Sequence, residues 1–304
     1  MASKLNLKCF AEQRDLVTPN GKLAVLCIDM DGTTIECQPY FDEAFEEFAL
    51  LMSLLGIDHQ DATDALKRIY YGSMPHRGFE RHRFPEALVE TYQALKQQFN
   101  LTSIPPEKEE IFRSLLKGIG SAPFFRRPKL FADCMQVLTR AHERFLLVAV
   151  TVGDYEAQLF KIRQSGLEKL FDDRIITLRE GKDDLVAQLI EDWNIDPEYS
   201  AFIGNSIRSD GVCLKVMNFI HVPFETSLSK EGDKLPEGTG FKTFKVKDWR
   251  DAEENAINRL IRQRDMANSG INASSCKTGN CNSSKPRRKR STSAGKPGAD
   301  KTAK

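Results

Sequence analysis

The sequence lacks the long apolar segments that mark membrane or exported proteins. No stretch of its 304 residues approaches the ~20 consecutive apolar residues that a bilayer-spanning helix needs. The N-terminal segment, MASKLNLKCFAEQRD, has no apolar core of the kind a signal peptide carries. The seven cysteines are odd in number and include no C-x-x-C pair. These absences predict a cytoplasmic protein without membrane contact and without a disulfide framework.

The sequence also lacks a basic excess in its main body. The formal net charge is +1, but residues 285–304 carry eight Lys and Arg against one Asp, so the other 284 residues are mildly acidic, near −6. A nucleic-acid surface is therefore predicted only for residues 285–304, as a weak contact through phosphates. A solvated end and a nuclear-import signal are the alternatives for this segment.

The stretch from Leu23 to Thr34 organises the chain. Its first six residues are apolar, which predicts a strand buried on both faces, as in a parallel sheet. The run ends in Asp29 and Asp31, and ligands of open parallel sheets bind beyond the carboxyl ends of the strands. Two carboxylates so close require a cation such as Mg²⁺, unless one of them holds a proton. An ordinary polar turn after a strand is the alternative.

The rest of the chain divides by its hydrophobic pattern. Residues 36–123 have helical periodicity and no convincing strand, whereas residues 124–266 alternate strands with helices. The alternation predicts an α/β fold, with a Rossmann-like parallel sheet core formed by residues 21–35 and 124–266 and an inserted α-helical domain. Expected strands cover 145–150, 174–177, 201–203 and 219–222, and expected helices cover 130–142, 155–164, 182–193 and 251–266.

The two ends of the chain are expected to lie outside this core. Residues 1–20 are weakly patterned and are interpreted as an N-terminal extension. From residue 267 onward polar residues dominate and apolar residues nearly vanish. Such a composition buries too little surface to offset its ordering entropy, so residues 267–304 are predicted to be a disordered basic tail.

Residues capable of chemistry follow four of the expected strands. They are Asp29 and Asp31 in an Asp-x-Asp-Gly-Thr run, Thr151, Lys182, and Asn205 with Asp210 in a Gly-Asn-x4-Asp run. The set and its order resemble the haloacid dehalogenase (HAD) superfamily over about residues 22–225. The resemblance implies that residues 36–123 form the cap domain of that family.

The resemblance also implies a role for each residue. Asp29 would be the nucleophile that forms an aspartyl phosphate, and Asp31 would protonate the leaving group and then help to activate water. Thr151 and Lys182 would bind the phosphoryl group, and Lys182 would also neutralise Asp29. The implied Mg²⁺ ligands are Asp29, Asp31 (through its backbone carbonyl in this family), Asn205 and Asp210. Asn205 departs from the Asp found in many relatives, which leaves its effect on metal affinity open.

Asp31 discriminates between reactions within the superfamily. An alkoxide leaving group needs a proton, whereas a halide does not, and the dehalogenase branch carries no Asp at this position. The leading hypothesis is therefore an Mg²⁺-dependent phosphomonoester hydrolase acting on a small phosphorylated metabolite. The alternatives are a catalytically weak binding or regulatory protein of this fold, tethered to nucleic acid by its tail, and a dehalogenase or phosphotransferase.

The segment from Met74 to Phe84 is unusual for its charge, with three Arg and two His in eleven residues. Arg77 and Arg81 are therefore candidates for binding a second anionic group of the substrate. The alternative is an exposed charged loop balanced by Glu80. Neither the substrate nor the oligomeric state is specified by the sequence.

Overall fold

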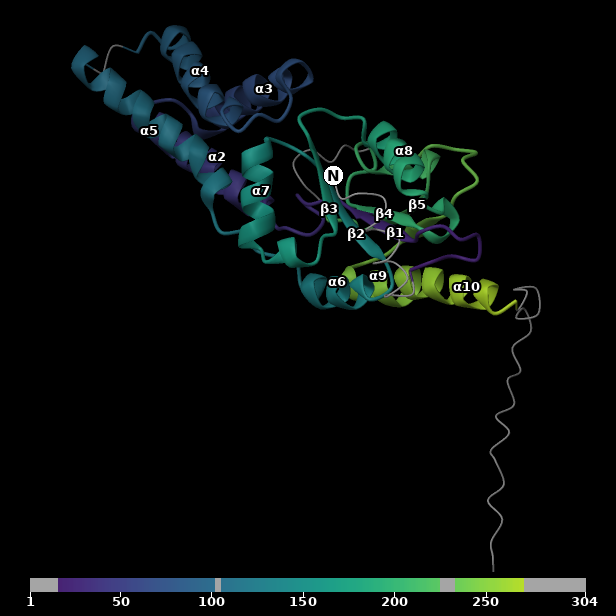
Figure 1. The fold of residues 1–304 in the computed structure, drawn as a ribbon. Coiled ribbons are helices and arrows are strands. Elements are labelled where there is room, and N and C mark those ends of the chain that lie inside the picture. Colours follow the sequence, from purple (N-terminus) through teal and green to yellow (C-terminus); the bar gives the residue numbers. More distant parts are fainter. Residues whose placement is uncertain (1–15, 102–104, 225–232, 271–304) are drawn as a thin grey trace, which may run out of the picture. The chain divides into compact units, whose positions relative to one another are not determined.

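The chain forms an α/β fold around a six-stranded parallel sheet (Figure 1). The computed structural model describes residues 16–101, 105–224 and 233–270. Residues 1–15 of the expected extension, and the predicted tail from residue 271, lie outside the described residues. The strand order is β3-β2-β1-β4-β5-β6. The strands are β1 (Val25–Ile28), β2 (Leu146–Val152), β3 (Asp173–Thr177), β4 (Ala201–Gly204), β5 (Asn218–His221) and β6 (Thr243–Lys245).

Strand β1 is buried on both faces, as its continuous apolar run predicts. Leu26 and Ile28 join one hydrophobic cluster with helices on one side of the sheet, and Val25 and Cys27 join another cluster on the other side. The first side is covered by α6 (Cys134–His142), α9 (Trp249–Ala252) and α10 (Asn258–Asn268), and the second by α8 (Lys182–Trp193) (Figure 1). Alternate side chains of one strand therefore hold two helical layers to the sheet.

Four helices lie between β1 and α6 in the described part of the chain. They are α2 (Gln38–Leu54), α3 (His59–Arg77), α4 (Arg83–Gln98) and α5 (Pro106–Phe125). These helices, which we call the helical insertion, share a hydrophobic core of their own, rich in aromatic rings. Its two connections to the sheet core run side by side, because Ile35 and Leu130 form an antiparallel bridge. Helix α7 (Tyr155–Gln164) follows β2.

Several boundaries differ from those expected from the sequence. Helix α6 begins at Cys134, not at residue 130, because Leu130 is engaged in the bridge to Ile35. The last helical segment continues from α9 through a π-helical turn (Glu253–Ile257) into α10, which ends at Asn268, so the tail boundary placed at residue 267 was two residues too early. Strand β6 was not predicted. Among the described residues, no helix has the length and apolarity needed to cross a membrane.

Candidate active site

The candidate site lies where the strand order of the sheet reverses direction. Strand β1 pairs with β2 on one side and with β4 on the other, so the connections leaving β1 and β4 diverge. Such switch points leave a crevice at the carboxyl ends of the strands. Asp29 follows β1 directly, and its backbone N–H donates to the carbonyl of Ile203 in β4 at 2.9 Å. Asp29 and the residues after β4 are therefore brought together by sheet pairing.

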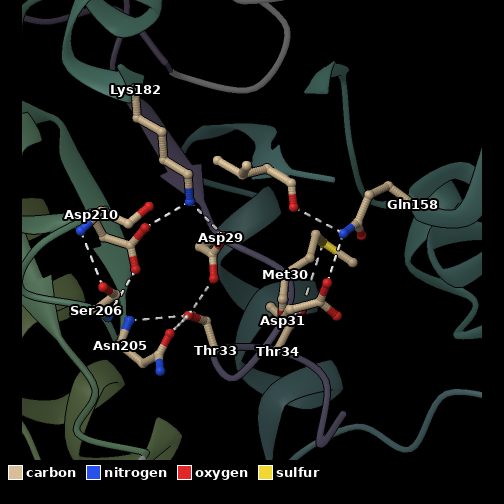
Figure 2. Close-up of polar contacts among 12 residues, drawn as sticks. Asp29, Met30, Asp31, Thr33, Thr34, Gln158, Lys182, Asn205, Ser206 and Asp210 are labelled. Atoms are coloured by element: carbon tan, nitrogen blue, oxygen red, sulfur yellow. Dashed lines mark hydrogen bonds and ion pairs between the residues drawn. The ribbon is translucent and has the colours of Figure 1, made fainter. Parts of the chain in front are cut away.

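Lys182 joins two carboxylates at this point. Its Nζ lies 2.6 Å from Asp29 Oδ1 and 2.6 Å from Asp210 Oδ1 (Figure 2). Lys182 is the first residue of α8 and is only 1% exposed, and Asp210 is equally buried. Three of the residues predicted from the sequence thus form one buried ion-pair cluster.

Burial and charge compete in setting the protonation of this cluster. Burial raises the pKa of Asp29 to about 7, although the Lys182 ammonium acts in the opposite direction. Burial by itself would lower the pKa of Lys182, but the carboxylates of Asp210 and Asp29 raise it above its ordinary value. Lys182 therefore remains charged, whereas Asp29 takes up a proton near neutral pH.

The position of Asp210 depends on close backbone packing at the end of β4. Asp210 Oδ2 accepts a hydrogen bond from the Ser206 N–H at 2.9 Å. A Cβ atom at Gly204 would lie 2.4 Å from this same carboxylate oxygen, so only glycine admits Asp210 at this distance. The glycine of the Gly-Asn-x4-Asp run is therefore required for steric reasons.

Thr33 connects Asp29 with Asn205 (Figure 2). Its Oγ1 lies 2.8 Å from Asp29 Oδ2 and 3.1 Å from Asn205 Oδ1, and it accepts a hydrogen bond from the Asn205 N–H. Since a hydroxyl has one proton, it donates to one of these two oxygens at a time. The Trp249 indole fixes the same loop by donating to the Thr33 carbonyl at 2.9 Å.

Asp31 belongs to a second ion pair that sequence reasoning missed. Lys161 Nζ lies 2.7 Å from both carboxylate oxygens of Asp31, and Gln158 Nε2 donates to Asp31 Oδ2 at 2.6 Å. Burial by itself would raise the pKa of Asp31, but the Lys161 charge and these hydrogen bonds hold it below its ordinary value. Gln158 and Lys161 are three residues apart on the helix after Thr151, and this spacing on one helical face was the available signal.

Thr151 is completely buried near the end of β2, and its Oγ1 has no hydrogen-bond partner among the residues that the structure describes. Thr151 does not itself line the cavity, but the next residue, Val152, does; since buried hydroxyls are normally satisfied, this orphan is a candidate contact for a bound ligand. The predicted contact of Thr151 with a phosphoryl oxygen fits this observation, and the contact itself stays a prediction.

Arg77 and Arg81 are not brought to the site. The Arg77 guanidinium lies 2.6 Å from Glu86 and 3.6 Å from Glu80, and the Arg81 side chain lies 3.7 Å from the Asp154 carboxylate. Neither arginine lines the cavity that contains the carboxylate cluster. The Arg77 pair instead links the end of α3 to the start of α4, and the Arg81 pair links the segment between them to the start of α7.

A cavity of about 170 Å³ opens over the carboxylate cluster. One wall comes from the strand ends and α7 and includes Asp29, Asp31, Lys161, Lys182 and Asp210. The opposite wall comes from the helical insertion and consists largely of aromatic side chains. The five lining carboxylates exceed the three lining cations, so an added cation would favour the entry of a phosphate dianion.

The donor set fits a magnesium ion. Asp29 and Asp210 each use one oxygen for Lys182 and the other for a single N–H or O–H donor, which leaves lone pairs on both carboxylates. Asn205 supplies an amide oxygen beside Asp29. No three His, Cys, Asp or Glu side chains form a metal site by themselves within the described ranges. Mg²⁺ commonly uses one or two carboxylates and takes its remaining ligands from water and substrate phosphate.

Comparison with known proteins places the chain in a family. Residues 23–215, more than half of the sequence, match the family model described as haloacid dehalogenase-like hydrolase. The chain therefore belongs to the HAD-like hydrolases, as the motif order indicated. No curated protein sequence matches it.

Solved structures agree with the fold. A haloacid dehalogenase-like family hydrolase from Xanthomonas campestris superposes with a TM-score of 0.62 at 20% identity, over 80% of this chain and 93% of that chain. An L-2-haloacid dehalogenase matches at 12% identity and TM-score 0.47, over 76% and 97% of the two chains. A protein described as a predicted phosphoglycolate phosphatase from Haemophilus somnus matches at 12% identity and TM-score 0.46, over 75% and 95%. Likeness at these levels does not choose between dehalogenase and phosphatase.

Proposed function

We propose that this HAD-like hydrolase is a magnesium-dependent phosphomonoester hydrolase acting through an aspartyl phosphate. The observation that carries the proposal is the placement of Asp29 and Asp31 on one cavity, with Asp29 in contact with the buried Lys182. A nucleophile needs a cation beside it to approach a phosphate dianion, and Lys182 is in contact with Asp29 for that purpose. Asp31 adds the carboxyl group that an alkoxide leaving group requires and that a halide does not.

Each of the site residues has a defined role in the proposed reaction. The Asp29 carboxylate attacks phosphorus, forming the O–P bond as the ester oxygen leaves. Asp31, on the same cavity, is ionised when paired with Lys161, so it must take up one proton when the substrate binds; it gives this proton to the leaving oxygen and takes one from the water that then breaks the Asp29–phosphorus bond. Thr151 Oγ1 donates to a phosphoryl oxygen, which satisfies the buried hydroxyl. Asp29, Asp210 and Asn205 would hold Mg²⁺, which neutralises phosphate charge when bound.

The test is release of inorganic phosphate from a panel of phosphomonoesters, assayed with and without Mg²⁺. A parallel arm measures halide release from 2-haloacids, which would identify a dehalogenase instead. We expect phosphate release that requires Mg²⁺, and no halide release. The control is Asp29→Asn, which leaves Lys182 paired with Asp210 and replaces the nucleophile by an amide. Undiminished phosphate release by purified Asp29→Asn protein would refute the covalent mechanism.

A further inference from the structure

We infer that the substrate carries a single phosphoryl group on an apolar, ring-containing organic group, which packs against the aromatic wall of the helical insertion. The inference deepens the proposed function and rests on it for the phosphoryl group. The aromatic wall is defined by six residues that line the cavity: Phe41, Tyr70, Tyr71, Met74, Phe79 and Phe124.

The two walls differ in composition, and this difference assigns the phosphoryl group to one wall and the organic group to the other. All charged side chains that line the cavity come from the strand ends, from α7 or from loops of the sheet core, and the insertion contributes none. A phosphoryl group therefore has favourable partners only at the core wall. The organic group faces mainly rings and a thioether, beside the Gln38 amide and the hydroxyls of Tyr70 and Tyr71, so apolar contacts and stacking outweigh hydrogen bonding on this wall.

The charges at the cavity disfavour a second anionic group on the substrate, although the Arg208–Glu180 pair is exposed and contributes little. The three lining cations are already paired: Lys161 with Asp31, Lys182 with Asp29 and Asp210, and Arg208 with Glu180. Asp154 adds a further carboxylate to the lining, and its partner Arg81 does not line the cavity. A bisphosphate or a phosphorylated carboxylic acid would place its second charge against acidic groups or against uncharged rings, and both arrangements are unfavourable.

Phe79 is held at the cavity by backbone contacts with the sheet core. Its N–H donates to the Leu178 carbonyl at 3.3 Å, and its own carbonyl accepts from the Asp154 N–H at 3.2 Å. Gly78 makes this approach possible, because it has a φ of +68° and a Cβ there would lie 2.4 Å from the Leu178 oxygen. The charged segment around Arg77 and Arg81 therefore anchors an aromatic side chain at the cavity.

The rings of the aromatic wall pack against other rings in the core of the helical insertion. Phe41 contacts Phe84 and Phe124 with ring centroids 5.3 Å and 5.5 Å apart, and Tyr70 contacts Phe84 at 4.7 Å. Phe84 is fully buried, so the rings rest on the insertion's own core. A preformed surface of this kind binds an apolar group without a large ordering cost. A cavity of roughly 150 Å³ is large enough for a benzene ring.

The experiment measures binding of stable phosphonates by calorimetry in the presence of Mg²⁺, which needs no turnover. The probes are benzylphosphonate, 2,3-dihydroxypropylphosphonate and methylenediphosphonate. We expect benzylphosphonate to bind about 10-fold or more tightly than the other two, because burying a ring contributes more than a hydroxylated chain. Phe79→Ala and Phe41→Ala should reduce that preference several-fold, and both side chains are only half-buried, so the fold should tolerate the change. Phe99→Ala is the matched control: Phe99 is a 39% exposed ring of the insertion that does not line the cavity.

Each result has a definite meaning. Equal or tighter binding of the dihydroxypropyl compound or the diphosphonate would overturn the inference, and so would absence of any phosphonate binding or an unchanged preference in both Phe→Ala variants. Phosphate release from aryl and polyol phosphates at equal rates would also overturn it while leaving the proposed function intact. Preferential binding of benzylphosphonate without release of phosphate from any ester would support the aromatic wall and defeat the proposed function.

Discussion

The two walls of the active-site cavity are built on different physical principles. On the core wall, Lys182 and Lys161 each hold carboxylates at 2.6–2.7 Å, and both ammonium groups are buried. On the insertion wall the lining side chains are uncharged, and most of them are half-buried rings. Reactive atoms must be placed accurately, and buried ion pairs fix their positions. Removing one partner of such a pair is strongly destabilising, because the other charge is left buried and uncompensated. Apolar contacts tolerate the substitution of one side chain by another of similar size, so the insertion wall is suited to setting substrate preference.

The first way to test this contrast is to remove the acid at the core wall. Asp31→Asn should lower turnover of alkyl phosphates by about 10²–10⁴-fold, the usual contribution of general acid–base catalysis. Turnover of p-nitrophenyl phosphate should fall much less, because its leaving group needs little protonation. The measurement is kcat/KM for both substrates. An equal fractional loss on both would show that Asp31 only shapes the site.

A second test breaks the buried ion-pair cluster. Lys182→Met leaves Asp29 and Asp210 buried without their shared cation, so the free energy of unfolding at neutral pH should fall by about 3–5 kcal/mol. The loss should shrink as the pH falls, because burial raises the pKa of Asp29 to about 7 and protonation of this carboxylate removes charge that the variant leaves unpaired. Urea denaturation at several pH values measures this.

The matched control for that variant is Lys215→Met. Lys215 also contacts a carboxylate, Asp183, but it is exposed, and solvent screens the pair. We expect almost no change in stability or in its pH dependence for this control. A stability loss as large as that of Lys182→Met would show that burial is not the source of the effect.

A third test addresses the partner of Asp31. Lys161→Met should reduce turnover about 10–100-fold, the range seen when a residue that orients an active-site group is removed. Lys161→Arg should recover part of the activity, because a guanidinium can bind both carboxylate oxygens. Arg163→Met, on the same helix but in an exposed pair with Glu168, is the control. Full activity of Lys161→Met would assign the pair to packing alone.

The smallest effect is expected outside both walls. Deletion of residues 271–304 should leave the melting temperature and the turnover of small substrates nearly unchanged, because this segment is polar and nearly without large apolar residues. If the basic run binds nucleic acid, the deletion should remove a weak, salt-sensitive affinity for a labelled duplex. A large drop in melting temperature would contradict the predicted disorder of this segment.

Much of the fold could be predicted because its signals are local. The apolar runs of β1 and β2 and the helical periodicity of the insertion need no knowledge of distant residues. Strand β6 was missed because its three residues alternate too briefly to show a pattern and are recognised only by pairing with β5. The start of α6 was misplaced for a similar reason, since Leu130 bridges to Ile35, nearly a hundred residues away.

The sequence by itself determined five of the six strands. It also determined the order of the site residues Asp29, Asp31, Thr151, Lys182 and Asp210, and residues that follow parallel strands meet at one edge. Only the tertiary structure decided their partners. It placed Lys161 and Gln158 on Asp31, and it paired Arg77 and Arg81 with acidic neighbours, so that neither arginine lines the cavity. It also assembled the aromatic wall from α2, α3, α5 and the loop at Phe79. Side-chain pairing across helices depends on how the elements pack, and no local periodicity in the sequence indicates which side chains from different elements will lie in contact.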